Sequence, residues 1–451
     1  MRCSIEDSGM NRPPLSEHFK IRMPSAIRLA QIEYMKRTDG VGQINVAIGN
    51  VSLPMHPAMQ KRLFNLGASE SPFRDGVVKY TPTVGMDETR AAFLNIIASS
   101  GFDTEGLHVQ ITDGGSQAME LVILGVSGPA GSEEKPILLI DPAYTNYIAM
   151  AARIGRKTVT IQRYLQDDGT YTLPDLREIQ HVIEEHRPGA LLVIPYDNPT
   201  GHFYDRESME ILAGLCVHYN MWMVSDEAYR ELYYCGKETS SIWGIDVPGI
   251  EGRKISIETA SKVWNACGLR IGALVTDSPE IHEKAVAENT ANLCPNAIGQ
   301  YIFGALAQED HKDLKRWYQK QQAYYKPLVN AFNEDIKRRL PGVIASSPDA
   351  AIYSVVDVKN IVGPEFDAKD FVLYCAREGE VDVAGERLTL LVAPMSGFYS
   401  VERGTPNPGR TQMRIAYVEP PERMKLVPAL FCDLLAAYIK KKEGVSLSLR
   451  A

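Results

Sequence analysis

Short apolar runs alternate with helical patterns through the middle of the chain, from about residue 75 to 330. The runs are rich in valine and isoleucine and read LHVQIT, PILLID, KTVTIQ, ALLVIP, MWMVSD, KISIE and RIGALVT. Continuous apolar runs of this length are typical of strands that are buried on both faces. The alternation therefore predicts an α/β fold in which helices cover a mostly parallel, seven-stranded sheet.

The segments between the runs carry apolar residues at helical spacing, and we expect helices at 87–99, 116–126, 145–154, 206–219 and 279–290. A longer polar and aromatic stretch, at about 310–338, has helical spacing as well. After it, the pattern changes to AAIYSVVDV, LTLLVAP and QMRIAYV, which are separated by helical segments. This change predicts a second, smaller domain of the α+β type.

The length of 451 residues exceeds the size at which a single hydrophobic core stops growing, so we expect two domains. The large domain is predicted at 71–330. The small domain is predicted to combine 331–451 with 21–70, because the segment INVAIGNVSLPMHPAM precedes the sheet and differs from it in pattern. Residues 1–20 contain a Pro-Pro pair and show little periodicity, which predicts an N-terminal arm.

The composition is that of an ordinary globular protein, with 45% hydrophobic and 23% charged residues. The net charge of -8 gives no electrostatic reason to bind nucleic acid or an anionic membrane surface. The chain has no apolar run of about eighteen residues and does not begin with a signal-peptide pattern, so we expect a cytoplasmic protein. Its seven cysteines are widely spaced without a CxxC pair, which argues for reduced cysteines and against a metal site.

Polar residues follow directly after four of the apolar runs. They are DGGSQ after HVQIT, YDNPTG after ALLVIP, SDEAY after MWMV and TASK after KISIE. Because parallel sheets place their functional groups at the carboxyl ends of strands, we expect these side chains to form one site.

Part of this set is suited to a phosphate group. The tripeptide Gly-Gly-Ser at 114–116 opens an apolar helix, where small residues allow close approach and free N–H groups favour an anion. Such a tripeptide by itself is more often a simple helix-capping turn. Thr259 and Ser261 add hydroxyl donors and Arg270 adds a planar cation, so that together they indicate one phosphate site.

Lys262 and Asp226 each have an ordinary interpretation and a chemical one. Most lysines are solvated at the surface, and an aspartate after a strand often caps the next turn. A lysine among small and apolar residues can instead be kept neutral enough to attack a carbonyl carbon. An aspartate at the end of a central strand can hold a pyridinium nitrogen protonated and so maintain an electron sink.

The ordered set resembles the class I/II aminotransferases, which are pyridoxal 5′-phosphate (PLP) enzymes of fold type I. The resemblance covers nearly the whole chain, from about residue 40 to 440. The segment SKVWNACGLRIG is similar to the family's lysine signature, in which an arginine follows the lysine by eight positions, as Arg270 follows Lys262. The resemblance implies that Lys262 is the Schiff-base lysine, that 71–330 is the PLP-binding domain, and that the enzyme exchanges an amino group between an L-amino acid and a 2-oxo acid.

The resemblance also implies a role for other motif residues. Asp226 would pair with the pyridine nitrogen, Tyr229 and Asn198 would hydrogen-bond the phenolic oxygen, and Tyr144 would stack on the ring. The phosphate would be held by Gly115, Ser116, Thr259, Ser261 and Arg270. Tyr80 would reach the phosphate of a neighbouring subunit, which implies a homodimer.

Substrate binding is implied for Gly49, Asn198 and Arg414, with Arg414 in QMRIAYV gripping the α-carboxylate. Members of the family that bind dicarboxylates often use a further arginine from the partner subunit, in the region that here reads AVAENTANLCPNAIGQ and contains no arginine. The runs GLRIGALVT, VAPMSGFY and MRIAYV nevertheless resemble a bacterial branch of aspartate aminotransferases. We therefore expect aspartate and 2-oxoglutarate first. Two features depart from the family, namely Pro195 in place of an asparagine and the loop 401–410.

Three alternatives remain open at this stage. A PLP-dependent β-eliminating lyase would use the same residues, and release of pyruvate or ammonia without an acceptor would identify it. A non-catalytic PLP-binding sensor fused to a DNA-binding domain fits poorly, because the N-terminal arm is short and the net charge is acidic. A Rossmann-type nucleotide binder lacks its GxGxxG motif here.

Overall fold

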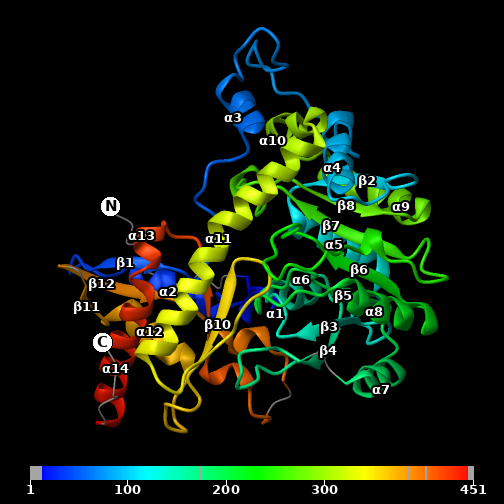
Figure 1. Cartoon of the computed structure of the whole chain (residues 1–451). Helices are drawn as coiled ribbons and strands as arrows, with labels where there is room; N and C mark the ends of the chain where they lie inside the picture. Colours follow the sequence, from blue (N-terminus) through cyan, green and yellow to red (C-terminus); the bar gives the residue numbers. More distant parts are fainter. Residues whose placement is uncertain (1–12, 173–174, 384, 402–403, 445–451) are drawn as a thin grey trace, which may run out of the picture.

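The computed structural model describes residues 13–172, 175–383, 385–401 and 404–444 (Figure 1). Residues 1–12 of the predicted N-terminal arm, which include Cys3, lie outside the described residues. A central sheet has seven strands in the order β2–β8–β7–β6–β5–β3–β4. Their bounds are His108–Thr112 (β2), Ile137–Asp141 (β3), Thr158–Gln162 (β4), Ala190–Val193 (β5), Trp222–Asp226 (β6), Lys254–Thr259 (β7) and Gly272–Thr276 (β8).

The sheet confirms the prediction of a mostly parallel α/β fold. Among the five strands β3 to β7, every pair of neighbouring strands is parallel. Strand β8 runs antiparallel to both of its neighbours, β7 and β2. Each of the seven apolar runs agrees with one of these strands to within two residues at each end. Because β3, β5, β6 and β7 are parallel, their carboxyl ends lie at one edge of the sheet, where the polar motifs follow them.

Helices cover both faces of the central sheet. One face packs on Gly115–Val126 (α5), Asn146–Arg153 (α6) and Pro279–Asn289 (α9), and the other on Asp87–Ser99 (α4), Leu176–His186 (α7), Arg206–His218 (α8) and Ala297–Gly304 (α10). The five predicted helices agree with α4, α5, α6, α8 and α9 to within one residue at each end. Alternate residues of a strand enter different cores, as Leu138 and Leu139 of β3 do.

A long helix, His311–Arg339 (α11), connects the central sheet to the smaller sheets (Figure 1). Its first half contacts the segment that follows β7 of the central sheet. There, Trp317 Nε1 donates a hydrogen bond of 2.8 Å to the carbonyl oxygen of Val263. Its second half buries Phe332 and Ile336 in the core beside the smaller sheets. The predicted helix at 310–338 is thus confirmed.

Two smaller sheets form the other part of the molecule. One has the order β1–β12–β11 and the other β13–β14–β10–β9. The bounds are Gly42–Asn45 (β1), Ile344–Ala345 (β9), Tyr353–Asp357 (β10), Val381–Val383 (β11), Glu386–Leu391 (β12), Ala393–Pro394 (β13) and Gln412–Ala416 (β14). The helices beside them are Ala26–Tyr34 (α2), Ala368–Arg377 (α12), Pro421–Met424 (α13) and Val427–Glu443 (α14). Together they make the α+β arrangement that the sequence predicts.

The segment before the central sheet contacts both parts of the molecule. Strand β1 pairs in parallel with β12 near the C-terminus. The helix Pro57–Phe64 (α3) instead lies beside the central sheet, because Arg62 forms an ion pair of 2.6 Å with Glu88 of α4 and donates to the carbonyl oxygen of Tyr301. The exact limits of the two domains stay a prediction. No helix in the described ranges is long and apolar enough to cross a membrane.

Candidate active site

A cavity of about 920 Å³ lies at the carboxyl ends of the central strands, between them and the smaller sheets. Twelve of the thirteen residues that the sequence nominates line it: Gly49, Gly115, Ser116, Tyr144, Asn198, Asp226, Tyr229, Thr259, Ser261, Lys262, Arg270 and Arg414. The exception is Tyr80, whose side chain is 79% exposed. Positions scattered from residue 49 to residue 414 therefore meet in one space.

Lys262 lies in the turn after β7, with its amine pointing across the cavity. Its Nζ donates a hydrogen bond of 2.5 Å to the carbonyl oxygen of Gly49. A Cβ on Gly49 would lie 2.1 Å from the hydroxyl oxygen of Tyr353, so this position has room only for glycine. The amine thus meets the backbone of the segment after β1.

Asp226 ends β6 and places its carboxylate in the same cavity. Its Oδ2 accepts a hydrogen bond of 2.6 Å from the hydroxyl of Tyr147, and its Oδ1 accepts one from the backbone N–H of Ala228. Burial raises the pKa of Asp226, and the hydrogen bond from Tyr147 lowers it. A buried carboxylate held in this way favours a cationic partner, such as a protonated ring nitrogen.

Tyr144 presents an aromatic ring beside Asp226 in the cavity lining. Its ring meets that of Tyr147 edge to face at 5.4 Å, and its hydroxyl accepts a hydrogen bond from Nδ2 of Asn146. Burial raises the pKa of Tyr144 to about 12, so the phenol is neutral at physiological pH. The ring is thus fixed by its neighbours and is suited to contact a flat ligand.

The start of α5 forms an anion cradle with the turn after β7. Gly114 has φ +83°, and a Cβ there would lie 2.3 Å from Nη2 of Arg270. A Cβ on Gly272 would lie 2.5 Å from the backbone N of Gly115, so the backbones are closely packed as well. The hydroxyl of Thr259 donates to that of Ser261 at 2.8 Å. Guanidinium, hydroxyl and free helix N–H groups together suit a phosphate.

Arg414 lies on β14 opposite the cradle and is buried, with 4% of its surface exposed. Its Nη1 donates to Oδ1 of Asn198 at 2.8 Å, and its Nη2 donates to the carbonyl oxygen of Ala47 at 2.7 Å. The guanidinium carbon lies 4.3 Å from the ring centre of Tyr353. The Nε has no hydrogen-bond partner in the described part of the chain. A cation held in this geometry is prepared for a carboxylate.

Tyr147 and Tyr353 line the cavity but were not singled out from the sequence. Tyr353 contacts Tyr229 through a hydrogen bond of 2.7 Å between the two hydroxyls. Tyr147 follows the DPAY motif within the predicted helix 145–154, where an aromatic residue is typical of the core. Tyr353 stands in the apolar run AAIYSVVDV and gave only a strand signal. Their functional positions depend on tertiary contacts, which periodicity does not report.

A buried pair supports the turn that carries Asn198. Arg163 is 1% exposed, and its Nη2 lies 2.9 Å from Oδ2 of Asp197. Asp197 also accepts hydrogen bonds from the backbone N–H and the hydroxyl of Thr200. The motif YDNPTG is therefore fixed from behind by a charge pair, which the sequence did not predict.

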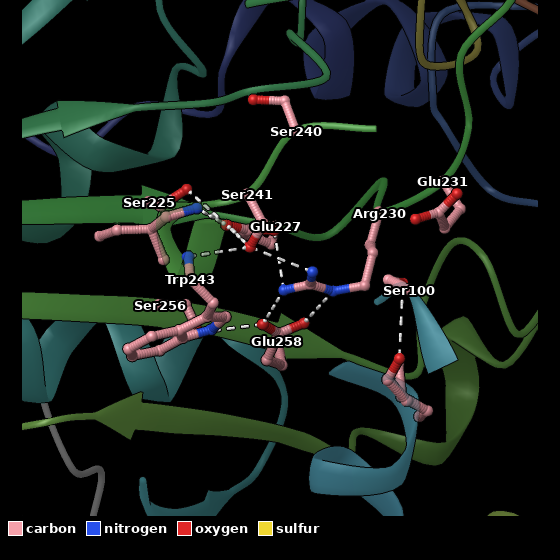
Figure 2. Close-up of polar contacts among 12 residues, drawn as sticks. Ser100, Ser225, Glu227, Arg230, Glu231, Ser240, Ser241, Trp243, Ser256 and Glu258 are labelled. Carbon is pink, nitrogen blue, oxygen red and sulfur yellow. Dashed lines mark hydrogen bonds and ion pairs between the residues drawn. The ribbon is translucent and has the colours of Figure 1, made fainter. Parts of the chain in front are cut away.

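A second group of charged and polar residues lies at the ends of β6 and β7, and Figure 2 shows its side chains gathered around Arg230. We call it the glutamate–arginine cluster, and it consists of Ser225, Glu227, Arg230, Ser241, Trp243, Ser256 and Glu258. Strand alternation separates the two groups, since Asp226 and Thr259 face the cavity whereas their neighbours Glu227 and Glu258 face away. The ends of β6 and β7 therefore carry cavity residues on one face and cluster residues on the other.

Arg230 lies between the two glutamates of this cluster (Figure 2). Its Nη2 is 2.8 Å from Oε2 of Glu227 and 2.5 Å from Oε1 of Glu258. Ser241 and the backbone N–H of Ile242 donate to Oε1 of Glu227 at 2.8 Å. Burial raises the pKa of Glu258 to about 7, although Arg230 lowers it. The cluster ties β6, β7 and the segment 240–243 together under the cavity.

The chain is similar to several aminotransferases. The family model for aminotransferase class I and II matches residues 43–413. The aspartate aminotransferase of Streptomyces avermitilis is 26% identical over 295 residues, which cover 64% of this chain and 68% of that protein. Kynurenine–oxoglutarate transaminase 3 of Homo sapiens is 28% identical over 243 residues, which cover 50% of this chain and 51% of that protein.

The fold is also similar to that of solved structures. The aspartate aminotransferase of Thermus thermophilus with maleate has a TM-score of 0.75 at 20% identity, and the match covers 94% of this chain and 100% of that one. The alanine aminotransferase of Pyrococcus furiosus has a TM-score of 0.74 at 23% identity, covering 94% and 99%. Because the family model spans most of the sequence, the chain belongs to the class I and II aminotransferases, a family of PLP-dependent enzymes of fold type I.

Proposed function

We propose that this protein binds PLP in the cavity and transfers an amino group from an L-amino acid, aspartate first, to a 2-oxo acid such as 2-oxoglutarate. The observation that carries the proposal is the meeting of Lys262, Asp226 and Arg414 in one cavity beside an anion cradle. Each supplies a different function: an amine, a carboxylate and a carboxylate-binding cation.

The residues fit PLP at each of its ends. The cradle of Gly115, Ser116, Thr259, Ser261 and Arg270 suits the phosphate, and a Cβ on Gly114 would overlap the guanidinium of Arg270 that belongs to it. The carboxylate of Asp226 suits the ring nitrogen, and burial gives it reason to take a cationic partner. Tyr144 offers a ring for stacking, while Tyr229 and Asn198 offer a hydroxyl and an amide to the phenolic oxygen. Lys262 would be the point of attachment.

The chain's own groups then determine which bond reacts. Bound PLP supplies an electron sink. Arg414 would bind the substrate α-carboxylate, with the backbone near Gly49 and the amide of Asn198 beside it. With the carboxylate fixed, the α-C–H bond would be held toward Lys262, whose Nζ, once the substrate amine has displaced it from its attachment, would take up the α-proton as general base and give it back as general acid. The aromatic residues of the lining would exclude water from this transfer.

We propose further that the active unit is a homodimer. Tyr80 does not line the cavity of its own protomer, and its side chain is 79% exposed beside Val77 and Val78, which are 53% and 56% exposed. Exposed apolar side chains in a row suit an interface. Tyr80 of the partner subunit would reach the phosphate through such a contact.

The test begins with cofactor binding. We expect purified protein supplied with PLP to develop a visible absorbance band and Lys262→Ala to lack the covalent form. A panel of amino acids with 2-oxoglutarate should then give glutamate, with aspartate among the best donors. Protein that stays colourless after addition of PLP would refute cofactor binding, and release of pyruvate or ammonia without an acceptor would indicate the lyase.

A further inference from the structure

Four cationic side chains line the cavity in the described part of the chain: Arg28, Lys262, Arg270 and Arg414. The proposed function uses three of them, for the substrate amine and proton, the phosphate and the α-carboxylate. Arg28 has no role in that scheme, and it belongs to α2, far from the sequence motifs. Of these four cations, Arg28 is therefore the one that is available to bind another part of the substrate.

Helix α2 is fixed so that Arg28 lines the cavity with Ser25 and Ile27. Gln31, one turn further along the helix, accepts a hydrogen bond of 2.6 Å from Nδ2 of Asn45, which also lines the cavity. Glu33 at the far end of the helix pairs with Arg377 of α12 at 2.9 Å. The helix is thus held on both sides.

The other charged residue at this end of the cavity is Glu419, and it already has partners. Its Oε1 accepts a hydrogen bond of 3.1 Å from the backbone N–H of Asn45, and its Oε2 lies 3.7 Å from Nε of Arg423. The guanidinium of Arg28 makes no hydrogen bond or ion pair within the residues that the structure describes, and it is exposed. A free planar cation facing a cavity is suited to a carboxylate.

We propose that Arg28 binds the side-chain carboxylate of a dicarboxylic substrate, and this inference rests on the proposed aminotransferase function. Arg414 and Arg28 would hold the two carboxylates of one molecule, such as aspartate or 2-oxoglutarate. The contact comes from the same protomer, which agrees with the lack of arginine in 285–300. Arg28 is then a specificity-determining residue that leaves the α-carbon chemistry untouched.

The experiment compares Arg28→Gln, Arg28→Lys and a control in the PLP-loaded protein. Arg177→Gln is the matched control, because Arg177 is an exposed arginine on α7 that does not line the cavity. Equilibrium binding is measured by calorimetry for two unreactive ligands, the dicarboxylate maleate and the monocarboxylate 3-phenylpropionate. Values of kcat/KM for aspartate and for alanine are measured as the apparent second-order rate constants of the first half-reaction, in which no 2-oxo acid is present.

We expect Arg28→Gln to weaken maleate binding and aspartate kcat/KM by roughly 10- to 100-fold, the range of a lost charge-assisted contact. Binding of 3-phenylpropionate and kcat/KM for alanine should stay within about threefold, since an uncharged side chain has no use for the guanidinium. Arg28→Lys should recover part of the loss, because it keeps the charge but not the planar fork. Arg177→Gln should behave as the unaltered protein.

Equal losses for both ligand classes, or no loss for maleate, would overturn the assignment of Arg28. Preference of the unaltered protein for 3-phenylpropionate over maleate would do the same. Failure of the proposed function is distinguishable, because the protein would then bind no PLP or would consume amino acids without forming the product of the 2-oxo acid.

Discussion

The two faces of strands β6 and β7 carry charged residues that are satisfied to different degrees. On the cavity face, Asp226 accepts two hydrogen bonds, and in the same cavity Nε of Arg414 on β14 has no hydrogen-bond partner among the described residues. On the other face, both glutamates of the glutamate–arginine cluster form ion pairs with Arg230 and accept hydrogen bonds from serine hydroxyls, and Oε2 of Glu227 has the ion pair as its contact among the described residues. The open face retains capacity for a ligand, whereas the closed face joins the strand ends.

The two faces separate residues that are adjacent in one sequence motif. Asp226 and Glu227 are adjacent in DEAY and have the same chemistry, yet the alternation of the strand sends them to opposite faces. We infer that substitutions on the cavity face mainly reduce activity and those in the cluster mainly reduce stability. Substitutions on either face test this division between activity and stability.

The largest effect is expected for Lys262→Ala. Loss of the general base should lower kcat by at least roughly 10³- to 10⁴-fold, because this amine has to move the α-proton. The free energy of unfolding should change by about 1 kcal/mol or less, since the lysine makes one hydrogen bond at the edge of a cavity. Steady-state kinetics and urea unfolding measure the two effects. A variant that is destabilised as strongly as it is inactivated would contradict the division.

Arg230→Met should have the opposite profile. Removing the guanidinium leaves Glu227 and Glu258 buried without a cation, which costs about 3–5 kcal/mol of unfolding free energy. Urea unfolding measures the change. The control is Arg206→Met, whose partner Glu210 lies at 2.7 Å on the surface and whose loss should cost under about 1 kcal/mol. Equal unfolding midpoints for the two variants would show that the cluster does not hold the strand ends.

Gly114→Ala should weaken PLP binding by roughly tenfold or more. The left-handed backbone at φ +83° costs about 1 kcal/mol or more for alanine, and the new Cβ overlaps Arg270. Titration with PLP gives the dissociation constant. Gly268→Ala is the control in the neighbouring turn, because a Cβ there meets nothing within 4 Å. A similar loss in both variants would argue against the cradle.

Glu258→Gln should alter the pH dependence of stability, and for a change of one pH unit this is the smallest effect. A raised pKa of about 7 means that the folded state holds a proton that the unfolded state releases from about pH 4.5 upward. The contribution is therefore fully present below about pH 4.5 and is lost as the pH rises to about 7, with a slope of at most about 1.4 kcal/mol per pH unit. Urea unfolding from pH 5 to 8, at roughly unit steps, should show this slope only with Glu258 present; parallel curves for the two proteins would contradict it.

The central sheet could be predicted because its strands are buried on both faces and appear as continuous apolar runs. The polar motifs could be placed at one edge because parallel strands share a direction. Residues that act through tertiary contacts could not be predicted in this way. Tyr147 has the pattern of a core residue, and Arg163 gives no signal of its pairing with Asp197.

The pairing of β1 with β12 shows the same limit at the level of the fold. A parallel contact between residues 42–45 and 388–391 has no local sequence signature, although the different pattern of that segment indicated that it left the central sheet. The position of Arg28 depends on this arrangement, because α2 is fixed by Asn45 and Arg377. Arg28, the cation proposed for the second carboxylate, was therefore identified from the structure and not from the sequence.

The most direct test of the account is the fate of the amino group. PLP-loaded protein is incubated with ¹⁵N-labelled aspartate and 2-oxoglutarate, and the products are followed by mass spectrometry and NMR. The account predicts ¹⁵N-labelled glutamate and oxaloacetate in equal amounts, without free ammonia, and no reaction in Lys262→Ala. Labelled ammonia released without 2-oxoglutarate, or unchanged aspartate and a full panel of unreacted amino acids, would contradict it.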